Sequence, residues 1–189
     1  MLKKKAMLID LTLCVGCNAC QIACKEANKL PGEEEKILSP TAYTALQEYD
    51  GVFVRRMCQH CDDPTCVSVY PVGAFTNTES GPVLYDADKC IGCRYCMQAC
   101  PFSVPRYEWS STSPRVKKCI FCHERLAQGL PTACSEACPT GATVFGDRDD
   151  LIKTANERLA AEPGKYVQKI YGVKEAGGTS IFYISSIPF

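Results

Sequence analysis

The chain has 189 residues, and its 21 basic side chains balance 21 acidic ones, which gives no electrostatic footprint for nucleic acid. Hydrophobic residues make up 46% of the chain, but 15 of them are cysteines, so the remaining apolar core is thin and a metal or disulfide staple is expected. No stretch approaches 18 consecutive apolar residues, so the sequence predicts no membrane span.

Short segments with strand-like composition alternate with cysteine groups along the chain. Segments of this kind precede or follow the groups at 7–13, 52–57, 71–77, 82–89, 101–108 and 139–147. A strand, a ligand loop, a short helix and a returning strand together form half of a ferredoxin domain. The sequence therefore predicts repeated ferredoxin-like halves.

Four groups contain all of the cysteines. They are Cys14, Cys17, Cys20 and Cys24; Cys58, Cys61 and Cys66; Cys90, Cys93, Cys96 and Cys100; and Cys119, Cys122, Cys134 and Cys138. An odd total, CxxC spacing and the lack of a recognisable signal peptide argue against a disulfide framework.

The first and third groups follow the C-x2-C-x2-C-x3-C spacing of bacterial ferredoxins, in which three thiolates hold one [4Fe–4S] cluster and the fourth reaches another. Gly16 and Gly92 lie inside these loops, where we expect the positive φ that such wrapping requires. Paired CxxC motifs also form four-thiolate zinc sites, but two runs of this spacing in one chain favour iron–sulfur clusters.

The order of the groups suggests how the halves pair. Groups two and three are separated as in an ordinary two-cluster ferredoxin, which leaves groups one and four to form a second unit around the first. We therefore expect an α+β fold with one ferredoxin-like unit nested inside the other. The discontinuous unit comprises 1–30 and 115–150, the contiguous unit 52–114, and 31–51 is expected to be an inserted excursion.

Residues 151–189 are expected to form a C-terminal helix and an extended strand arm. The helix is predicted over 147–161, with Asp147 as N-cap and an apolar stripe of Leu151, Ile152, Ala155 and Leu159. Segments 165–173 and 178–187 indicate a terminal strand pair or an arm.

The four ordered groups resemble those of the four-cluster iron–sulfur subunit of molybdopterin oxidoreductases in the dimethyl sulfoxide reductase superfamily. Members of this family serve polysulfide, tetrathionate and nitrate reductases, formate dehydrogenases and some hydrogenases. The resemblance covers about residues 6–150 and includes 171–185. It implies a non-catalytic subunit that relays single electrons between a molybdenum or tungsten molybdopterin subunit and a quinone-linked membrane subunit or another carrier.

The resemblance also implies crossed ligation of four clusters. The implied ligand sets are Cys14, Cys17, Cys20 and Cys138; Cys119, Cys122, Cys134 and Cys24; Cys58, Cys61, Cys66 and Cys100; and Cys90, Cys93 and Cys96 with position 70. Position 70 is Tyr70, where the family pattern has cysteine. The first three sites are expected to hold [4Fe–4S] clusters.

Tyr70 leaves three outcomes open for the fourth site. The site holds a [3Fe–4S] cluster on three thiolates, a [4Fe–4S] cluster with phenolate, water or hydroxide on the unique iron, or no cluster. The first is favoured, because a phenolate is a harder donor, with an ordinary pKa near 10, and competes poorly for iron in a sulfur cluster.

Other functions remain open at this stage: a free polyferredoxin that diffuses between partners, the electron-transfer subunit of a hydrogenase complex, or a zinc module. The expected location is cytoplasmic or peripheral to a membrane, and periplasmic only through export with a signal-bearing partner. His60 and His123 each adjoin a ligand cysteine, and solvent-facing loop positions are favoured over hydrogen bonds to cluster sulfur.

Overall fold

A three-stranded sheet forms the centre of the computed structural model, which describes residues 3–189. Its strands lie in the order β8 (Thr143–Asp147), β1 (Lys5–Asp10) and β9 (Ile181–Ile184). β1 runs antiparallel to β8, with Lys5 opposite Asp147, and parallel to β9, with Met7 opposite Ile181. The last five residues of β1 are buried, so this central strand fixes the position of the first cysteine loop that follows it.

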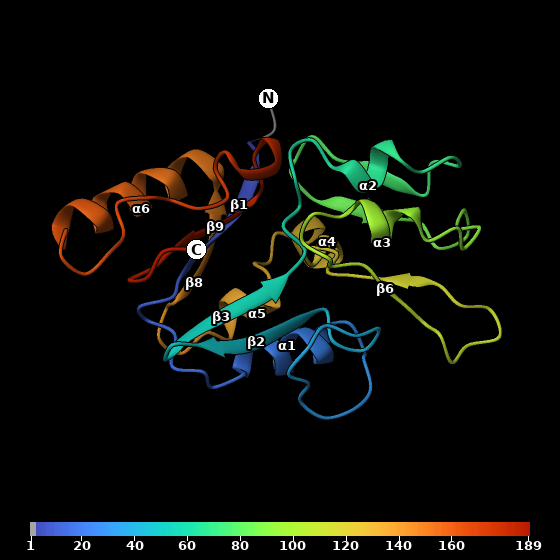
Figure 1. Ribbon diagram of the computed structural model, residues 1–189, viewed down its shortest axis with the longest axis horizontal. Coiled ribbons are helices and arrows are strands. Elements are labelled where there is room, and N and C mark those ends of the chain that lie inside the picture. Colours follow the sequence, from blue (N-terminus) through green and yellow to red (C-terminus); the bar gives the residue numbers. More distant parts are fainter. Residues whose placement is uncertain (1–2) are drawn as a thin grey trace.

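Helix α6 (Arg148–Ala161) packs on this sheet, beside β1 and β9 in Figure 1. Its buried residues Leu151, Ala155 and Leu159 belong to the predicted apolar stripe and pack with Leu8 and Phe182. The helix prediction is therefore confirmed. Asp147 lies at the N-cap as predicted, but its carboxylate binds Lys3 and Lys5 instead of the helix backbone.

A strand is present within 178–187 as expected, but it belongs to the three-stranded sheet instead of an extended arm. All four residues of β9 are buried, and the strand pairs with β1 along its length. Residues 165–173 form no strand with it, and one antiparallel bridge joins Tyr171 to Tyr183. The reason is composition: an uninterrupted Ile-Phe-Tyr-Ile run gains most where both of its faces are buried, as they are in β9 at the edge of this sheet.

The hairpin of β2 (Thr44–Tyr49) and β3 (Val52–Met57) includes a strand that the sequence reasoning missed. β2 lies in the range expected to be an excursion and pairs with β3 in the range assigned to the contiguous unit. Asp50 and Gly51 link them, both at positive φ, which is the usual conformation of a tight Asp-Gly hairpin turn. That dipeptide was the signal available in the sequence.

Short elements carry the remaining cysteine groups. They are α1 (Ala19–Ala27), α2 (Thr65–Ser68), β4 (Phe75–Asn77), β5 (Val83–Tyr85), α3 (Tyr95–Ala99), β6 (Arg106–Tyr107), β7 (Val116–Lys117), α4 (His123–Ala127), α5 (Ala133–Glu136) and a 3-10 turn at Glu175–Gly177. β4 pairs with β5 and β6 with β7, both antiparallel. Helix α1 contacts α5, and α2 contacts α3.

The molecule is a small α+β fold in which α6 and the α2–α3 pair lie on opposite sides of the three-stranded sheet (Figure 1). The β2–β3 hairpin, α1 and α5 lie together between and below them in that view. Within residues 3–189, no helix combines the length and apolar composition needed to cross a membrane.

Candidate iron–sulfur cluster sites

The glycines of the first and third cysteine loops adopt the left-handed conformation predicted for them. Gly16 has φ of 71° and Gly92 has φ of 70°. A Cβ at Gly16 would lie 2.6 Å from the Phe53 ring, and a Cβ at Gly92 would lie 2.8 Å from the Tyr107 hydroxyl. Backbone conformation and close packing therefore both require glycine at these two equivalent positions.

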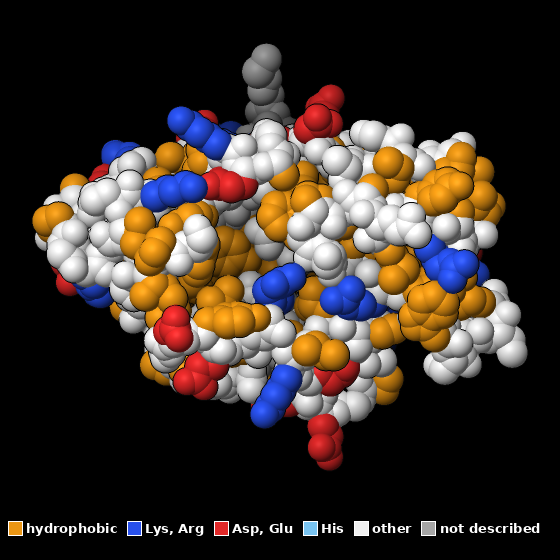
Figure 2. All heavy atoms as spheres, in the orientation of Figure 1, with side chains coloured by type: hydrophobic (Ala, Val, Ile, Leu, Met, Phe, Trp, Pro, Cys, Tyr) orange, Lys and Arg blue, Asp and Glu red, His pale blue; other side chains and the backbone are white. Residues whose placement is uncertain are grey.

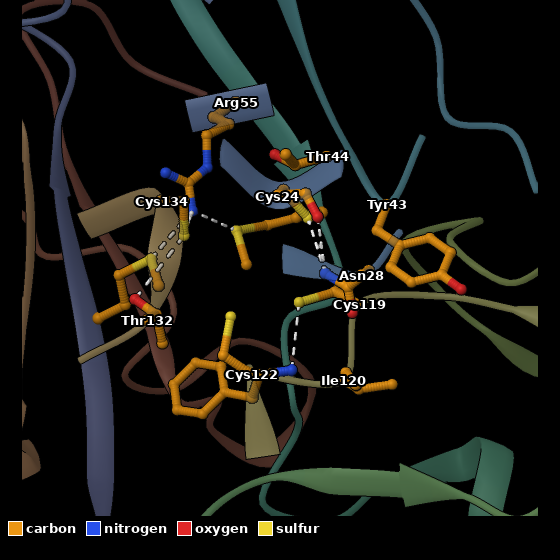
Figure 3. Close-up of a pocket in the computed structure, with 13 residues that line it drawn as sticks. Cys24, Asn28, Tyr43, Thr44, Arg55, Cys119, Ile120, Cys122, Thr132 and Cys134 are labelled. Carbon is orange, nitrogen blue, oxygen red and sulfur yellow. Dashed lines mark hydrogen bonds between the residues drawn. The ribbon is translucent and has the colours of Figure 1, made fainter. Parts of the chain in front are cut away.

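One cavity is lined by cysteines from two distant segments of the chain. Cys24 from α1 faces Cys119, Cys122 and Cys134 (Figure 3). Their sulfur atoms are directed toward a common space, although 95 or more residues separate Cys24 from the others. Contact between α1 and α5 produces this arrangement, because α1 carries Cys24 and α5 carries Cys134. The set coincides with one of the implied ligand sets.

A second cavity lies beside the start of α1. It is lined by Cys14, Cys17, Cys20 and Cys138. The first three come from the loop after β1 and the start of α1, whereas Cys138 comes from the turn that leads into β8. Because β8 and β1 are paired, that turn lies beside the first cysteine loop.

A third cavity belongs to the middle of the chain. It is lined by Cys58, Cys61, Cys66 and Cys100. The first three lie in the loop after β3 and in α2, and Cys100 ends α3. The Thr65 hydroxyl donates to the Ala99 carbonyl oxygen at 2.9 Å, so α2 is joined directly to the end of α3.

The donor set of these cavities fits an iron–sulfur cluster. Each cavity presents four thiols, which are the soft donors that such clusters require. Within residues 3–189, no three ligating side chains converge closely enough to hold one metal ion.

The fourth predicted cluster site lacks a fourth cysteine, and two tyrosines lie beside it. Cys90, Cys93 and Cys96 pack with Tyr70 and Tyr85 in one apolar cluster. The Tyr70 hydroxyl accepts a hydrogen bond from the backbone N–H of residue 91 at 3.3 Å, and the Tyr85 hydroxyl accepts one from that of residue 116 at 3.3 Å. Each phenol also donates to the Cys90 sulfur.

These contacts set the protonation of the three groups. Burial and the hydrogen bond to Cys90 raise the pKa of both Tyr70 and Tyr85, so both phenols stay neutral. Burial alone would raise the pKa of Cys90, but hydrogen bonds from Tyr70, Tyr85 and the Gly92 backbone outweigh it and lower that pKa. In this arrangement Tyr70 is a neutral donor to the Cys90 sulfur and favours its thiolate form. The contact with Tyr85 was missed by the sequence reasoning, which examined only position 70.

Several other buried or half-buried cysteines have a raised pKa instead of a lowered one. Burial raises the pKa of Cys24, Cys61 and Cys96 to about 12, and that of Cys66 to about 11, with neighbouring thiols adding to the effect. Such thiols keep their protons until a cation replaces them. Binding of iron at these positions must therefore release protons.

The two histidines occupy different environments. His60 is fully buried, with Nδ1 accepting a hydrogen bond from the Val83 N–H at 3.0 Å and its ring centroid 4.8 Å from that of Phe121. The solvent-facing position favoured for His60 is therefore wrong, because the β4–β5 hairpin covers it. His123 is exposed at the start of α4, as that interpretation expects.

Comparison with known proteins identifies the class. A family model described as a 4Fe-4S dicluster domain matches residues 49–148, which contain the second, third and fourth cysteine groups. The chain belongs to this family of iron–sulfur proteins.

Three relatives align with almost the whole chain. A protein of Nitratidesulfovibrio vulgaris strain Hildenborough is 41% identical over 97% of this chain and 54% of its own length. Hydrogenase-2 operon protein HybA of Escherichia coli O157:H7 is 36% identical over 97% of this chain and 70% of its own length. The iron-sulfur subunit of the nitrate-inducible formate dehydrogenase of Escherichia coli strain K12 is 33% identical over 95% and 67%.

The predicted resemblance to iron–sulfur subunits of oxidoreductase complexes is confirmed by these matches. The chain spans between about half and seven tenths of the length of these relatives.

Proposed function

We propose that the chain is an electron-transfer subunit that holds about four iron–sulfur clusters per chain. The observation that carries this proposal is the set of three cavities, each lined by four cysteines drawn from two different groups. The proposed ligand sets are the crossed sets named above, each with a [4Fe–4S] cluster. Iron–sulfur clusters supply one-electron oxidation and reduction at potentials that the surrounding protein adjusts.

The chain's own residues do three things in this role. The cysteine thiols lose protons and bind iron, while the left-handed glycines shape the loops around the clusters. The thin apolar core excludes water from the buried sulfurs. Backbone and side-chain donors near the sulfurs adjust the local charge, as Phe121 N–H does toward Cys119 Sγ at 3.4 Å.

We further propose that the clusters lie in two nested ferredoxin-like units. Two antiparallel pairings support this: β1 with β8 joins the strand before group one to the strand after group four, and β4 with β5 links groups two and three. Contact of α1 with α5 parallels contact of α2 with α3. The outer unit comprises 1–30 and 115–150, the inner unit 52–114, and 151–189 completes the central sheet.

The fourth site is proposed to hold a [3Fe–4S] cluster on Cys90, Cys93 and Cys96. The buried, neutral phenol of Tyr70 supports this. Tyr70 keeps its proton in a hydrogen bond to Cys90, so it is not a phenolate and does not serve as an iron ligand. A [4Fe–4S] cluster with an oxygen ligand at the corner is the alternative.

The proposed partners are a molybdopterin catalytic subunit and a quinone-interacting membrane subunit. One relative is named as the iron-sulfur subunit of a formate dehydrogenase, which supports a role for this chain in a multi-subunit complex. The match to HybA, a hydrogenase-2 operon protein, makes a hydrogenase complex the second candidate. Val15 and Ile91, at equivalent positions of the two ferredoxin loops, are 61% and 62% exposed. Two cluster loops therefore approach the surface, where a partner could exchange electrons.

The end of the molecule that carries α2, α3 and β6 offers an apolar surface for such contact (Figure 2). Tyr95 and Trp109 are exposed there, and the Arg94 guanidinium lies 5.3 Å from the Trp109 ring centroid. A location peripheral to a membrane, on the cytoplasmic side or on the periplasmic side after export with a partner, follows from this assignment.

Anaerobic purification with iron and sulfide analysis tests the proposal. We expect about 15 or 16 iron atoms per chain, with a similar amount of sulfide. Gel filtration of native extract separates a complex subunit, which elutes with larger partners, from a free polyferredoxin. Zinc in place of iron and sulfide would overturn the assignment.

A further inference from the structure

Arg55, on strand β3, is a buried cation without a carboxylate partner. Its side chain belongs to a residue only 2% exposed, and no ion pair among residues 3–189 includes it. Arginine stays charged under all ordinary conditions. A buried guanidinium without a counter-charge is strongly destabilising, so its surroundings must supply negative charge.

Sulfur atoms surround this guanidinium. Nη2 lies 3.3 Å from Cys134 Sγ, 2.9 Å from Met57 Sδ and 3.0 Å from Met7 Sδ. Nη1 donates to the Thr143 hydroxyl at 3.0 Å, while Nε has no hydrogen-bond partner within the described chain. Figure 3 shows the guanidinium directed into the cavity toward Cys134.

Arg55 lines two cysteine cavities at once. It borders the cavity of Cys24, Cys119, Cys122 and Cys134, and also the cavity of Cys14, Cys17, Cys20 and Cys138. Its charge therefore acts on both. The acidic groups that influence it most are Cys134 and Cys20, one from each cavity.

We propose that Arg55 is the shared counter-charge of the two cluster sites of the outer unit and raises the reduction potential of both. The inference deepens the proposed function and depends on clusters occupying these two sites. Four thiolates around a cluster carry net negative charge, which grows by one on reduction. A fixed cation in a low-dielectric wall therefore stabilises the reduced form more than the oxidised form.

Two variants of Arg55 separate the effect of its charge from the effect of its side-chain shape. Arg55→Gln keeps a hydrogen-bond donor for Thr143 but removes the charge, whereas Arg55→Lys keeps the charge and loses the guanidinium fork. In the Gln variant we expect the midpoint potentials of the two cluster sites beside Arg55 to fall by at least about 59 mV. For one electron this shift is a tenfold change in the reduction equilibrium constant. The Lys variant should restore most of this loss.

Arg56→Gln is the matched control. Arg56 is the next residue on β3, and its Nη2 donates to the Phe102 carbonyl oxygen at 3.0 Å, away from the two cavities. Its substitution should leave those two potentials unchanged. Potentials are followed by reductive titration with electron paramagnetic resonance, and Cys134→Ser and Cys14→Ser identify the signals of the two sites.

The outcomes separate the inference from the proposed function. If the purified wild-type chain contains no iron and no sulfide, the proposed function itself is refuted. Loaded wild-type and Gln chains with equal potentials would leave that function intact and overturn the role of Arg55. If the Gln chain takes up no clusters while the Lys chain does, the charge is required and the inference stands. Failure of both variants to load would overturn it, because the Lys variant retains the charge.

Discussion

The Arg158 guanidinium donates a hydrogen bond of 2.9 Å from Nη1 to Asp10 Oδ2, across 148 residues of sequence. Asp10 is fully buried at the end of β1, and its carboxylate also accepts hydrogen bonds from the hydroxyls of Tyr166 and Thr12. Thr12 opens the loop that carries Cys14. The pair therefore ties the C-terminal helix to the strand that positions the first cysteine group.

Arg158→Met should destabilise the loaded protein by about 2 kcal/mol, because it leaves a buried carboxylate with one partner fewer. This corresponds to a fall of roughly 4–8 °C in Tm for a domain of this size, measured by circular dichroism. Lys153→Met is the control, since Lys153 forms an exposed pair with Glu157 at 3.9 Å and its loss should change Tm little. Equal changes in both variants would contradict the role of the buried pair.

Removal of iron should unfold the protein. The apolar core is organised around cysteine loops, such as those of Cys58, Cys119 and Cys134 in the largest buried cluster, so metal-binding energy is also folding energy. Chelation under denaturant-free conditions should abolish the cooperative thermal transition seen by far-UV circular dichroism. An iron-free chain that retains a cooperative transition would show that the polypeptide packs without its clusters.

Cys138→Ser should damage the cluster bound by Cys14, Cys17 and Cys20, because Cys138 lines their cavity. The matched variant Cys134→Ser should damage the other cluster of the outer unit instead. Spectroscopic titration of the two variants should therefore show the loss of different signals. Loss of the same signal in both would refute the crossed assignment.

Tyr70 should make the fourth cluster different from the other three. Oxidised wild-type protein should show one near-isotropic paramagnetic signal of about one spin per chain, since a [3Fe–4S] centre is paramagnetic when oxidised and ordinary [4Fe–4S] centres are silent. Tyr70→Cys should abolish this signal and lower the potential of that site.

Tyr85→Phe is the control for Tyr70, because it removes the other phenol that donates to Cys90 without offering a new ligand. The paramagnetic signal should persist in this variant. Silent oxidised wild-type protein with four complete clusters by iron analysis would mean that Tyr70 or a solvent oxygen binds the fourth iron.

Cluster retention should improve as pH rises. Iron-free Cys24 and Cys61 are protonated at neutral pH, because burial raises their pKa to about 12 wherever the fold persists and the unfolded chain has the ordinary thiol pKa of about 8.5, whereas both are deprotonated when bound to iron. The loaded state is therefore favoured by increasing pH up to the pKa of the iron-free thiol and disfavoured as pH falls, by up to about tenfold per pH unit for each such thiol.

The measurement is the temperature at which visible cluster absorption is lost, recorded anaerobically between pH 6 and pH 9. We expect this temperature to fall steadily toward pH 6. A retention temperature that does not change over this range would show that proton release does not accompany binding.

The local spacing of residues determined much of this protein without any structure. Ligand loops, the left-handed Gly16 and Gly92, and the helix that begins after Asp147 all depend on neighbours within a few residues, and the structure agrees with each. The pairing of cysteine groups by their order stays a prediction, which the mixed lining of the three cavities and the pairing of β1 with β8 support.

Only the tertiary structure decided features that depend on packing between distant segments. Burial placed β9 against β1 at the edge of the central sheet, covered His60 with the β4–β5 hairpin, and brought Tyr85 beside Cys90. Arg55 is the clearest case, since its sequence neighbours Val54 and Arg56 carry no sign that its charge is buried between two cysteine cavities. Desolvation depends on every element that surrounds a group, and a pattern along one strand does not contain that information.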